Sequence, residues 1–171
     1  ITHINKFPKL KKLRIVDNDK LVNLEGIEKL VDLNELVIHG NYNLKIGKSL
    51  NKKDSLKKLQ TLIIEEHSNN ININNLKNAA PNITHLEIKM KNGNIVLSDF
   101  ESLNQLEKLV LINYNQLDND KNRLKLKLPG TISSLILSKN LESYFDKGNL
   151  NKFLIKREKE KKIIYERLGG E

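Results

Sequence analysis

The sequence contains no cysteine, and this absence excludes three kinds of structure at once. Without a thiol there can be no disulfide bond, no cysteine-ligated zinc ion and no cysteine nucleophile. Long apolar runs are missing as well. The longest aliphatic run, Leu109 to Ile112, is far too short to cross a bilayer or to form the core of a signal peptide. We therefore expect no membrane segment in this stretch.

Arginine is scarce although the chain is basic. Only 4 of the 30 Lys and Arg residues are arginine, while the formal net charge is +9. Arginine makes the bidentate contacts by which proteins recognise phosphates and bases, so its scarcity disfavours nucleic-acid recognition as the reason for the charge. Lys, Asn and Ile share A/T-rich codons, and we attribute most of the lysine excess to that bias.

One pattern recurs along the chain. Residues 33–41, LNELVIHGN, read Leu-x-x-Leu-x-Leu-x-x-Asn with every fixed position filled. The middle leucine of this unit returns at steps of 23, 26, 24, 23 and 26 residues, which gives six repeats over nearly the whole chain. A period of 20 to 29 residues with this pattern is typical of a strand-and-turn unit that stacks on copies of itself. The six middle leucines are Leu13, Leu36, Leu62, Leu86, Leu109 and Leu135.

These residues resemble the leucine-rich-repeat superfamily over about residues 7–140. The short repeats, with apolar residues at every third position between the strands, are similar to the class that includes internalins and phosphatase-regulatory subunits. The phrases PNITHLEI and LPGTISSLIL also resemble, more loosely, FNIP repeats. The resemblance implies an α/β repeat fold: a horseshoe-shaped solenoid with a six-stranded parallel sheet on the concave face and short helical or extended returns on the convex face.

We expect two regions in the chain. Residues 1–140 form the solenoid, which we expect to be truncated at its N-terminal end because the chain starts in the middle of a return segment. Residues 141–171 form a capping segment and a charged helix from about Leu150 to Leu168, which Gly169 would end. Pairs such as Glu158 with Lys162 would stabilise that helix.

The segments between the strands give three further expectations. The ninth position of the unit is Asn18, Asn41 and Asn140 in three repeats, and its amide is expected to bind backbone groups of the turn. A short helix containing Leu76 is expected to end before Pro81. The polar stretch 118–123 is expected to be a loop.

Side chains alternate along a strand, so the outward-facing positions can be read as columns across the sheet. Four of the six residues in the central column are aliphatic, and the flanking columns mix both charges with hydroxyl groups. An apolar stripe with a polar rim favours protein recognition. The alternative interpretation is that β-branched residues simply suit strands. The predicted partner-binding residues are Arg14, Val37, His39, Ile63, Glu65, His85, Glu87, Lys89, Val110, Ile112 and Ile136.

The sequence thus favours a non-catalytic adaptor, targeting or regulatory module that binds a protein partner on its concave face. RNA binding through lysine-rich surfaces is one alternative, and the recognition domain of a larger surface or secreted protein is another. The resemblance implies no catalytic residue. We expect no metal, cofactor or small-molecule substrate, because the four histidines are scattered: His39 is placed next to Glu65 on the adjacent strand, and His85 lies in a different column. Many extracellular domains of this kind are closed by cystines, so the lack of cysteine favours an intracellular location.

Truncation of one repeat leucine tests the predicted core. Leu86→Ala should lower the free energy of unfolding by about 2–5 kcal/mol, because a buried leucine loses both its transfer free energy and its packing contacts. Thermal denaturation followed by circular dichroism measures the effect. A melting temperature unchanged within error would show that Leu86 is not buried.

Overall fold

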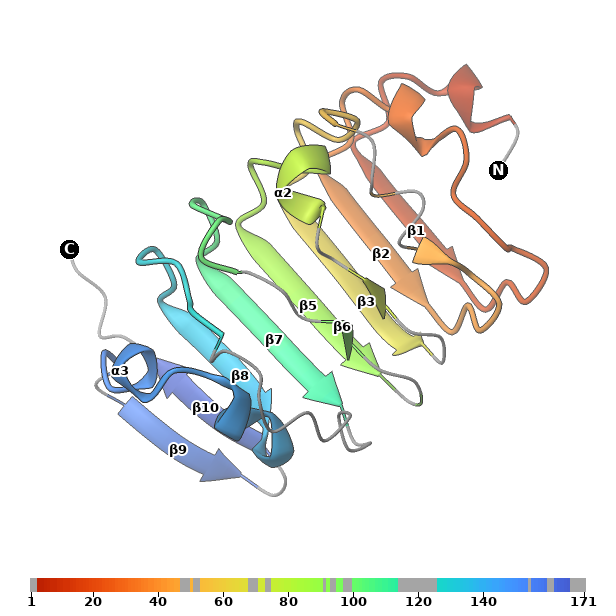
Figure 1. Ribbon diagram of the computed structural model, residues 1–171. Helices are drawn as coiled ribbons and strands as arrows, with labels where there is room; N and C mark the ends of the chain where they lie inside the picture. The colour runs from red at the N-terminus through yellow and green to blue at the C-terminus, as the bar shows by residue number, and fades with distance from the viewer. Residues whose placement is uncertain are drawn as a thin grey trace.

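The computed structural model describes residues 3–46, 50, 53–67, 71–72, 75–90, 92, 95–96, 100–113, 126–153, 155–159 and 162–166, and all structural statements below refer to these residues. Their main element is an eight-stranded sheet with the strand order β1-β2-β3-β5-β7-β8-β10-β9. Figure 1 shows the strands side by side in chain order, except for the last two.

Six of these strands are parallel, one from each repeat. Each strand pairs in register with the next, so that the repeat leucines lie opposite one another from Leu13↔Leu36 through to Leu109↔Leu135. The predicted six-stranded parallel sheet in a repeat solenoid is therefore confirmed. The strands are β1 (Lys12–Val16), β2 (Glu35–His39), β3 (Thr61–His67), β5 (His85–Met90), β7 (Lys108–Asn113) and β8 (Ser134–Ser138).

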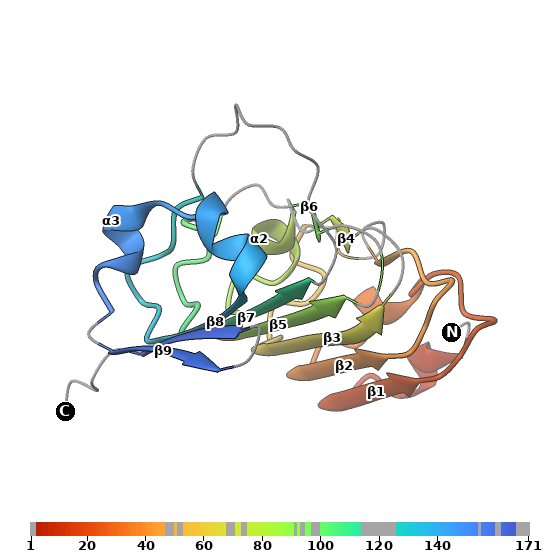
Figure 2. The ribbon, with the colours of Figure 1, turned by 90° about the horizontal axis from the view of Figure 1, so that it is seen from below.

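The segments between the strands form a second layer on one face of the sheet (Figure 2). This return layer contains the 3₁₀ turns η1 (Ile4–Lys6) and η2 (Ile27–Lys29), and the short helix α2 (Leu76–Ala79) that was expected before Pro81. It also contains a small parallel pair, β4 (Ile71–Asn72) and β6 (Ile95–Val96), which the sequence did not predict. The loop predicted over residues 118–123 lies outside the described residues.

The core lies between the sheet and the return layer. Leu36, Leu62, Leu86, Leu109 and Leu135 are each 0% exposed. The first four lie between the equivalent leucines of both neighbouring repeats, and Leu135 lies beside Leu109. Leu13 of the first repeat is only half-buried. The burial that sequence analysis assigned to Leu86 is confirmed.

The predicted C-terminal helix is wrong. After the 3₁₀ segment η3 (Lys139–Tyr144) and the short helix α3 (Lys147–Leu150), the chain forms a hairpin of β9 (Ile155–Lys159) and β10 (Lys162–Glu166). Strand β10 pairs antiparallel with β8 and places Ile164 opposite Ile136 in the ladder.

The physical reason lies in the edge of β8. A pair such as Glu158 with Lys162 stabilises a helix by only about 0.2–0.5 kcal/mol. The outer edge of β8 instead offers a row of backbone groups to which β10 can bind. Strand β10 also contains the run Ile163, Ile164, Tyr165, whose residues have strong β propensity. Tertiary pairing therefore outweighs the local helical pattern.

The expected role of the ninth-position asparagine is confirmed at Asn41, which is fully buried. Its Nδ2 donates to the backbone oxygens of Ile15, at 3.0 Å, and of His39, at 2.7 Å. Its Oδ1 accepts from the backbone N–H of Asn18 at 3.1 Å. The side-chain amide of Asn41 thus forms hydrogen bonds with backbone groups at the ends of both β1 and β2.

The residue before this asparagine needs an unusual backbone conformation. Gly40 has φ +65°, and a Cβ atom there would lie 1.9 Å from Oδ1 of Asp17. Asp17 and Glu66, at the equivalent positions of the first and third repeats, also have positive φ. Equivalent positions in β5 and β7 are instead strand residues, Met90 and Asn113, so the turn changes after the third repeat.

Removal of the buried amide should destabilise the stack. Asn41→Ala leaves buried backbone groups of two repeats without their partner, and we expect a loss of about 2 kcal/mol in the free energy of unfolding. Urea denaturation measures the free energy of unfolding of each variant. The control is Asn43→Ala, which removes one exposed hydrogen bond, to the backbone oxygen of Asp19. Equal losses for the two variants would contradict the structural role of Asn41.

Candidate functional site

The sheet face opposite the return layer, called the open face below, carries the side chains of three columns. Strand register places the central column in line, from Arg14↔Val37 to Val110↔Ile136. All eleven residues predicted to bind a partner lie on this face. The central column holds Arg14, Val37, Ile63, Glu87, Val110 and Ile136; one flanking column holds His39, Glu65, Lys89 and Ile112; and the other holds His85.

The aliphatic stripe on this face is less accessible than the sequence predicted. Val37, Val110 and Ile112 are 7%, 3% and 1% exposed, whereas Ile63 and Ile136 are half-buried. In the strand register each of these two valines lies between longer residues on adjacent strands, Val37 between Arg14 and Ile63 and Val110 between Glu87 and Ile136. The accessible apolar surface of this face is therefore supplied by Val16 on β1, which is 43% exposed, and by the half-buried Ile63 and Ile136.

Charged side chains form a continuous network across three strands. Lys89 of β5 is its centre: the Nζ atom donates to Oε1 of Glu65 on β3 at 2.7 Å and also contacts Oε1 of Glu87. Oε2 of Glu65 lies 3.5 Å from Nδ1 of His39 on β2. Oε2 of Glu87 lies 3.4 Å from Nε2 of His85. We call these five residues the His39–His85 network.

The network fixes the charge of its central groups. The neighbouring His85 imidazole, together with Lys89, lowers the pKa of Glu87 to about 2 against the opposing effect of burial. Partial burial acts to lower the pKa of Lys89, but Glu65 and Glu87 outweigh it and raise this pKa above its ordinary value. Glu87 is the least exposed carboxylate here, with 12% of its side chain accessible. At neutral pH Glu87 is thus ionised and Lys89 is protonated.

The remainder of the open face divides into two parts. Toward β1, Lys12 forms an ion pair with Glu35 at 2.9 Å, and Arg14 is exposed. Toward β8 the columns hold Ser134 and Ile136 on β8, with Lys108 and Val110 opposite them on β7. The face is charged over β1 to β5 and more apolar over β7 and β8.

Sequence reasoning found the members of the network but only one of its contacts. It placed His39 next to Glu65, which the structure confirms. It missed that Lys89 bridges two carboxylates. The signal was present, because Glu65 and Lys89 share a column on adjacent strands, and Glu87 and Lys89 are two residues apart on one strand and so face the same side.

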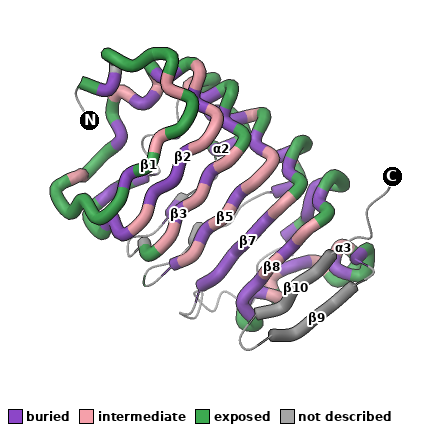
Figure 3. Tube along the Cα trace, turned by 180° about the vertical axis from the view of Figure 1, so that it is seen from behind, coloured by how far each residue is buried: buried purple, intermediate pink, exposed green. Residues whose placement is uncertain are grey.

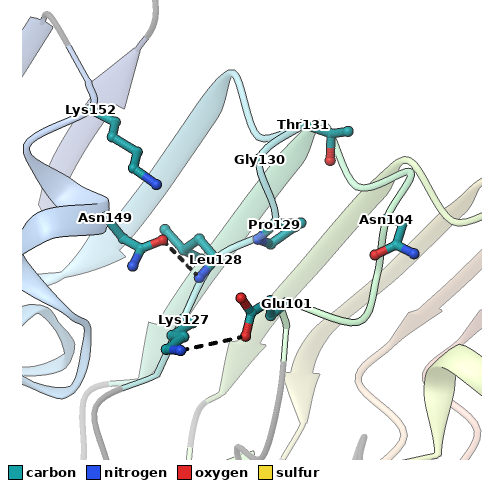
Figure 4. Close-up of a pocket in the computed structure, with 9 residues that line it drawn as sticks. All are labelled: Glu101, Asn104, Lys127, Leu128, Pro129, Gly130, Thr131, Asn149 and Lys152. Atoms are coloured by element: carbon teal, nitrogen blue, oxygen red, sulfur yellow. Dashed lines mark hydrogen bonds and ion pairs between the residues drawn. The ribbon is translucent and has the colours of Figure 1, made fainter.

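A second concave feature lies away from the open face (Figure 4). It is a cavity of about 610 Å³ between α3 and the segments that precede β7 and β8. Lys127 and Glu101 face each other at 4.0 Å, and the backbone N–H of Leu128 donates to Oδ1 of Asn149 at 3.3 Å. Its lining contains no histidine or cysteine. The lining residues are Glu101, Asn104, Lys127, Leu128, Pro129, Gly130, Thr131, Asn149 and Lys152.

Acidification should reveal the contribution of Glu87. Its pKa is about 2 in the folded chain and 4.5 without the fold, so its stabilising effect is complete above pH 4.5 and is lost as the pH falls toward 2. Because the network is partly exposed, we expect Glu87→Gln to cost about 1–2 kcal/mol at pH 6. Urea denaturation at pH 6 and near pH 3 should show the gap from wild type narrowing at the lower pH. The exposed Glu25 supplies the control, Glu25→Gln; a gap for Glu87→Gln that is constant with pH would contradict the assignment.

Within the described residues, no three or more His, Cys, Asp or Glu side chains are grouped so that they could hold a metal ion. No described helix is both long and apolar enough to cross a membrane. Comparison of the chain with protein-family models, with curated proteins and with solved structures gave no match.

Proposed function

We propose that the chain is a leucine-rich-repeat module that binds a protein partner on the open face of its sheet and catalyses no reaction itself. The observation that carries this proposal is the His39–His85 network, which lies beside the half-buried Ile63 on a face that no described segment covers. Ordered charges next to an accessible apolar side chain are the composition of a recognition surface.

The dimensions of the open face fit a macromolecule. The six parallel strands, at about 4.8 Å spacing, span about 24 Å of the sheet. The three columns of outward positions supply about 18 residues over these strands, near the lower end of the 20 to 30 residues that each side contributes to a standard protein interface. Small molecules are usually bound in enclosed pockets, so a helix or an extended loop of a protein is the better ligand for an open sheet.

The charge pattern favours a protein over RNA. The lysines of the network and of β1 are each held by a carboxylate: Lys89 by Glu65 and Glu87, and Lys12 by Glu35. A phosphate backbone would have to displace these carboxylates. Alternating charges that are fixed in place instead give specificity toward a protein surface of complementary pattern. The net charge of +9 keeps RNA binding as the competing function in the experiment below.

The test uses two variants with opposite expectations. Ile63→Asp combined with Ile136→Asp places charges at the two half-buried aliphatic positions of the central column. Val110 is unsuitable, because at 3% exposure an aspartate there would disturb the fold. The control is Lys77→Glu, an exposed position on α2 in the return layer. Circular dichroism and thermal melting must first show that both variants are folded.

Each protein is used for affinity capture from the native cells, and captured proteins and RNA are identified by mass spectrometry and sequencing. We expect protein partners to be retained by wild type and Lys77→Glu and to bind the double variant about a hundredfold more weakly. Equal capture by all three proteins would contradict binding on the open face. RNA that elutes at moderate salt from all three would assign function to the basic surfaces instead.

A further inference from the structure

The cavity beside α3 has walls that are fixed to one another by hydrogen bonds. Asn149 of α3 accepts from the backbone N–H of Leu128 at 3.3 Å, and its Nδ2 donates to Oδ1 of Asp146 at 3.2 Å. Close by, the backbone N–H of Leu126 donates to the backbone oxygen of Tyr144 at 2.8 Å. A cavity whose walls are held in this way needs little rearrangement to receive a ligand.

The other wall consists of the two turns that precede β7 and β8. The hydroxyl group of Thr131 donates to the backbone oxygen of Leu106 at 2.7 Å, which joins one turn to the other. Leu128 is buried beneath the cavity, whereas Asn104 and Gly130 are exposed at its rim. Figure 3 shows exposed turns at this edge of the sheet beside the more buried strands. A solute can therefore reach the cavity directly from solvent.

The charges in the cavity favour an anionic ligand. Glu101 and Lys127 pair with each other, but their charged atoms are 4.0 Å apart and their side chains are 60% and 62% exposed, so the pair contributes little to stability. Lys152 follows α3 on the other side, and its side chain extends toward the segment 127–131 (Figure 4). Among the described residues, no carboxylate pairs with Lys152. Two ammonium groups and one carboxylate leave one positive charge in excess.

The remaining lining restricts the rest of the ligand. The side-chain amide of Asn104 offers a donor and an acceptor, and the carboxylate of Glu101 offers acceptors, which together suit the hydroxyl groups of a ligand. The described lining contains no aromatic side chain, whereas nucleobases are usually stacked on aromatic rings. The volume of about 610 Å³ lies within the usual range for small-molecule sites. These features favour a hydroxyl-rich molecule over a nucleotide.

We propose that this cavity binds a small anionic sugar derivative, with its carboxylate or phosphate group at Lys152 and its hydroxyl groups at Glu101 and Asn104. The ammonium group of Lys152 donates charge-assisted hydrogen bonds to the anion, and Lys127 can turn from its loose contact with Glu101 to join it. Because the cavity lies away from the open face, this ligand is independent of the protein partner proposed above.

Five solutes separate the effect of the charge from that of the hydroxyl groups. D-Gluconate and D-glucose 6-phosphate carry both and distinguish a carboxylate from a phosphate. D-Glucose carries hydroxyl groups alone, and acetate and inorganic phosphate carry the charge alone. Titrations of the ¹⁵N-labelled chain followed by NMR measure each affinity. We expect saturable binding of at least one of the two sugar anions, with shifts at the amides of Gly130, Thr131 and Asn149, and about tenfold weaker binding of the other three solutes.

Paired variants test the two ends of the cavity. Lys152→Gln should weaken binding of the sugar anion about tenfold, because the anion loses its charged donor. Its control is Lys147→Gln, which removes the same charge from an exposed position of α3 outside the lining and should have little effect. Asn104→Ala should weaken binding about threefold through the loss of a neutral hydrogen bond, and the exposed neighbour Gln105→Ala is its control. Circular dichroism confirms that each variant is folded.

Three results would overturn the proposal. The first is no saturable binding of either sugar anion up to about 10 mM, or amide shifts confined to residues outside the cavity. The second is equal affinity for glucose, or for acetate and inorganic phosphate, because the charge or the hydroxyl groups would then play no part. The third is an equal loss of affinity in Lys152→Gln and Lys147→Gln, because the anion would then respond to the net charge of +9 and not to the cavity.

Discussion

The structure depends on the in-register stacking of leucines between neighbouring repeats. No single repeat can bury its apolar strand face alone, so each contributes a layer that is shielded only by the layers beside it. Because side chains alternate along a strand, this register also fixes which residues share the opposite face. The alignment that buries Leu62 beside Leu86 therefore brings Glu65 next to Lys89. The His39–His85 network is in this sense a by-product of core packing.

The parallel sheet could be predicted from the sequence because its information is local and repeated six times. The leucine spacing determines each strand, its register and the membership of every column. The C-terminal hairpin could not be predicted in this way, because residues 155–166 take their structure from an edge that β8, a strand earlier in the chain, leaves open. The charge spacing of the segment suits a helix, and only the sheet edge shows why a strand forms.

The candidate site could also be predicted only in part. Column membership located all eleven residues on one face of the sheet, but two properties of that face depend on the relative lengths of side chains on adjacent strands. Lys89 reaches two carboxylates because it is long and flexible, and Val110, which is 3% exposed, lies between the longer residues Glu87 and Ile136. The sequence pattern gives the residue type at each position but not these contacts. It therefore could not distinguish the accessible aliphatic residues of the open face from the buried ones.

The hairpin covers one end of the repeat stack. Strands β10 and β9 continue the sheet beyond the last parallel strand, and the chain that leads to them buries Leu141 and Phe145. Since repeat arrays are stabilised mainly by nearest-neighbour contacts, this cover gives the last repeat a neighbour on both sides and should protect β8 from local unfolding.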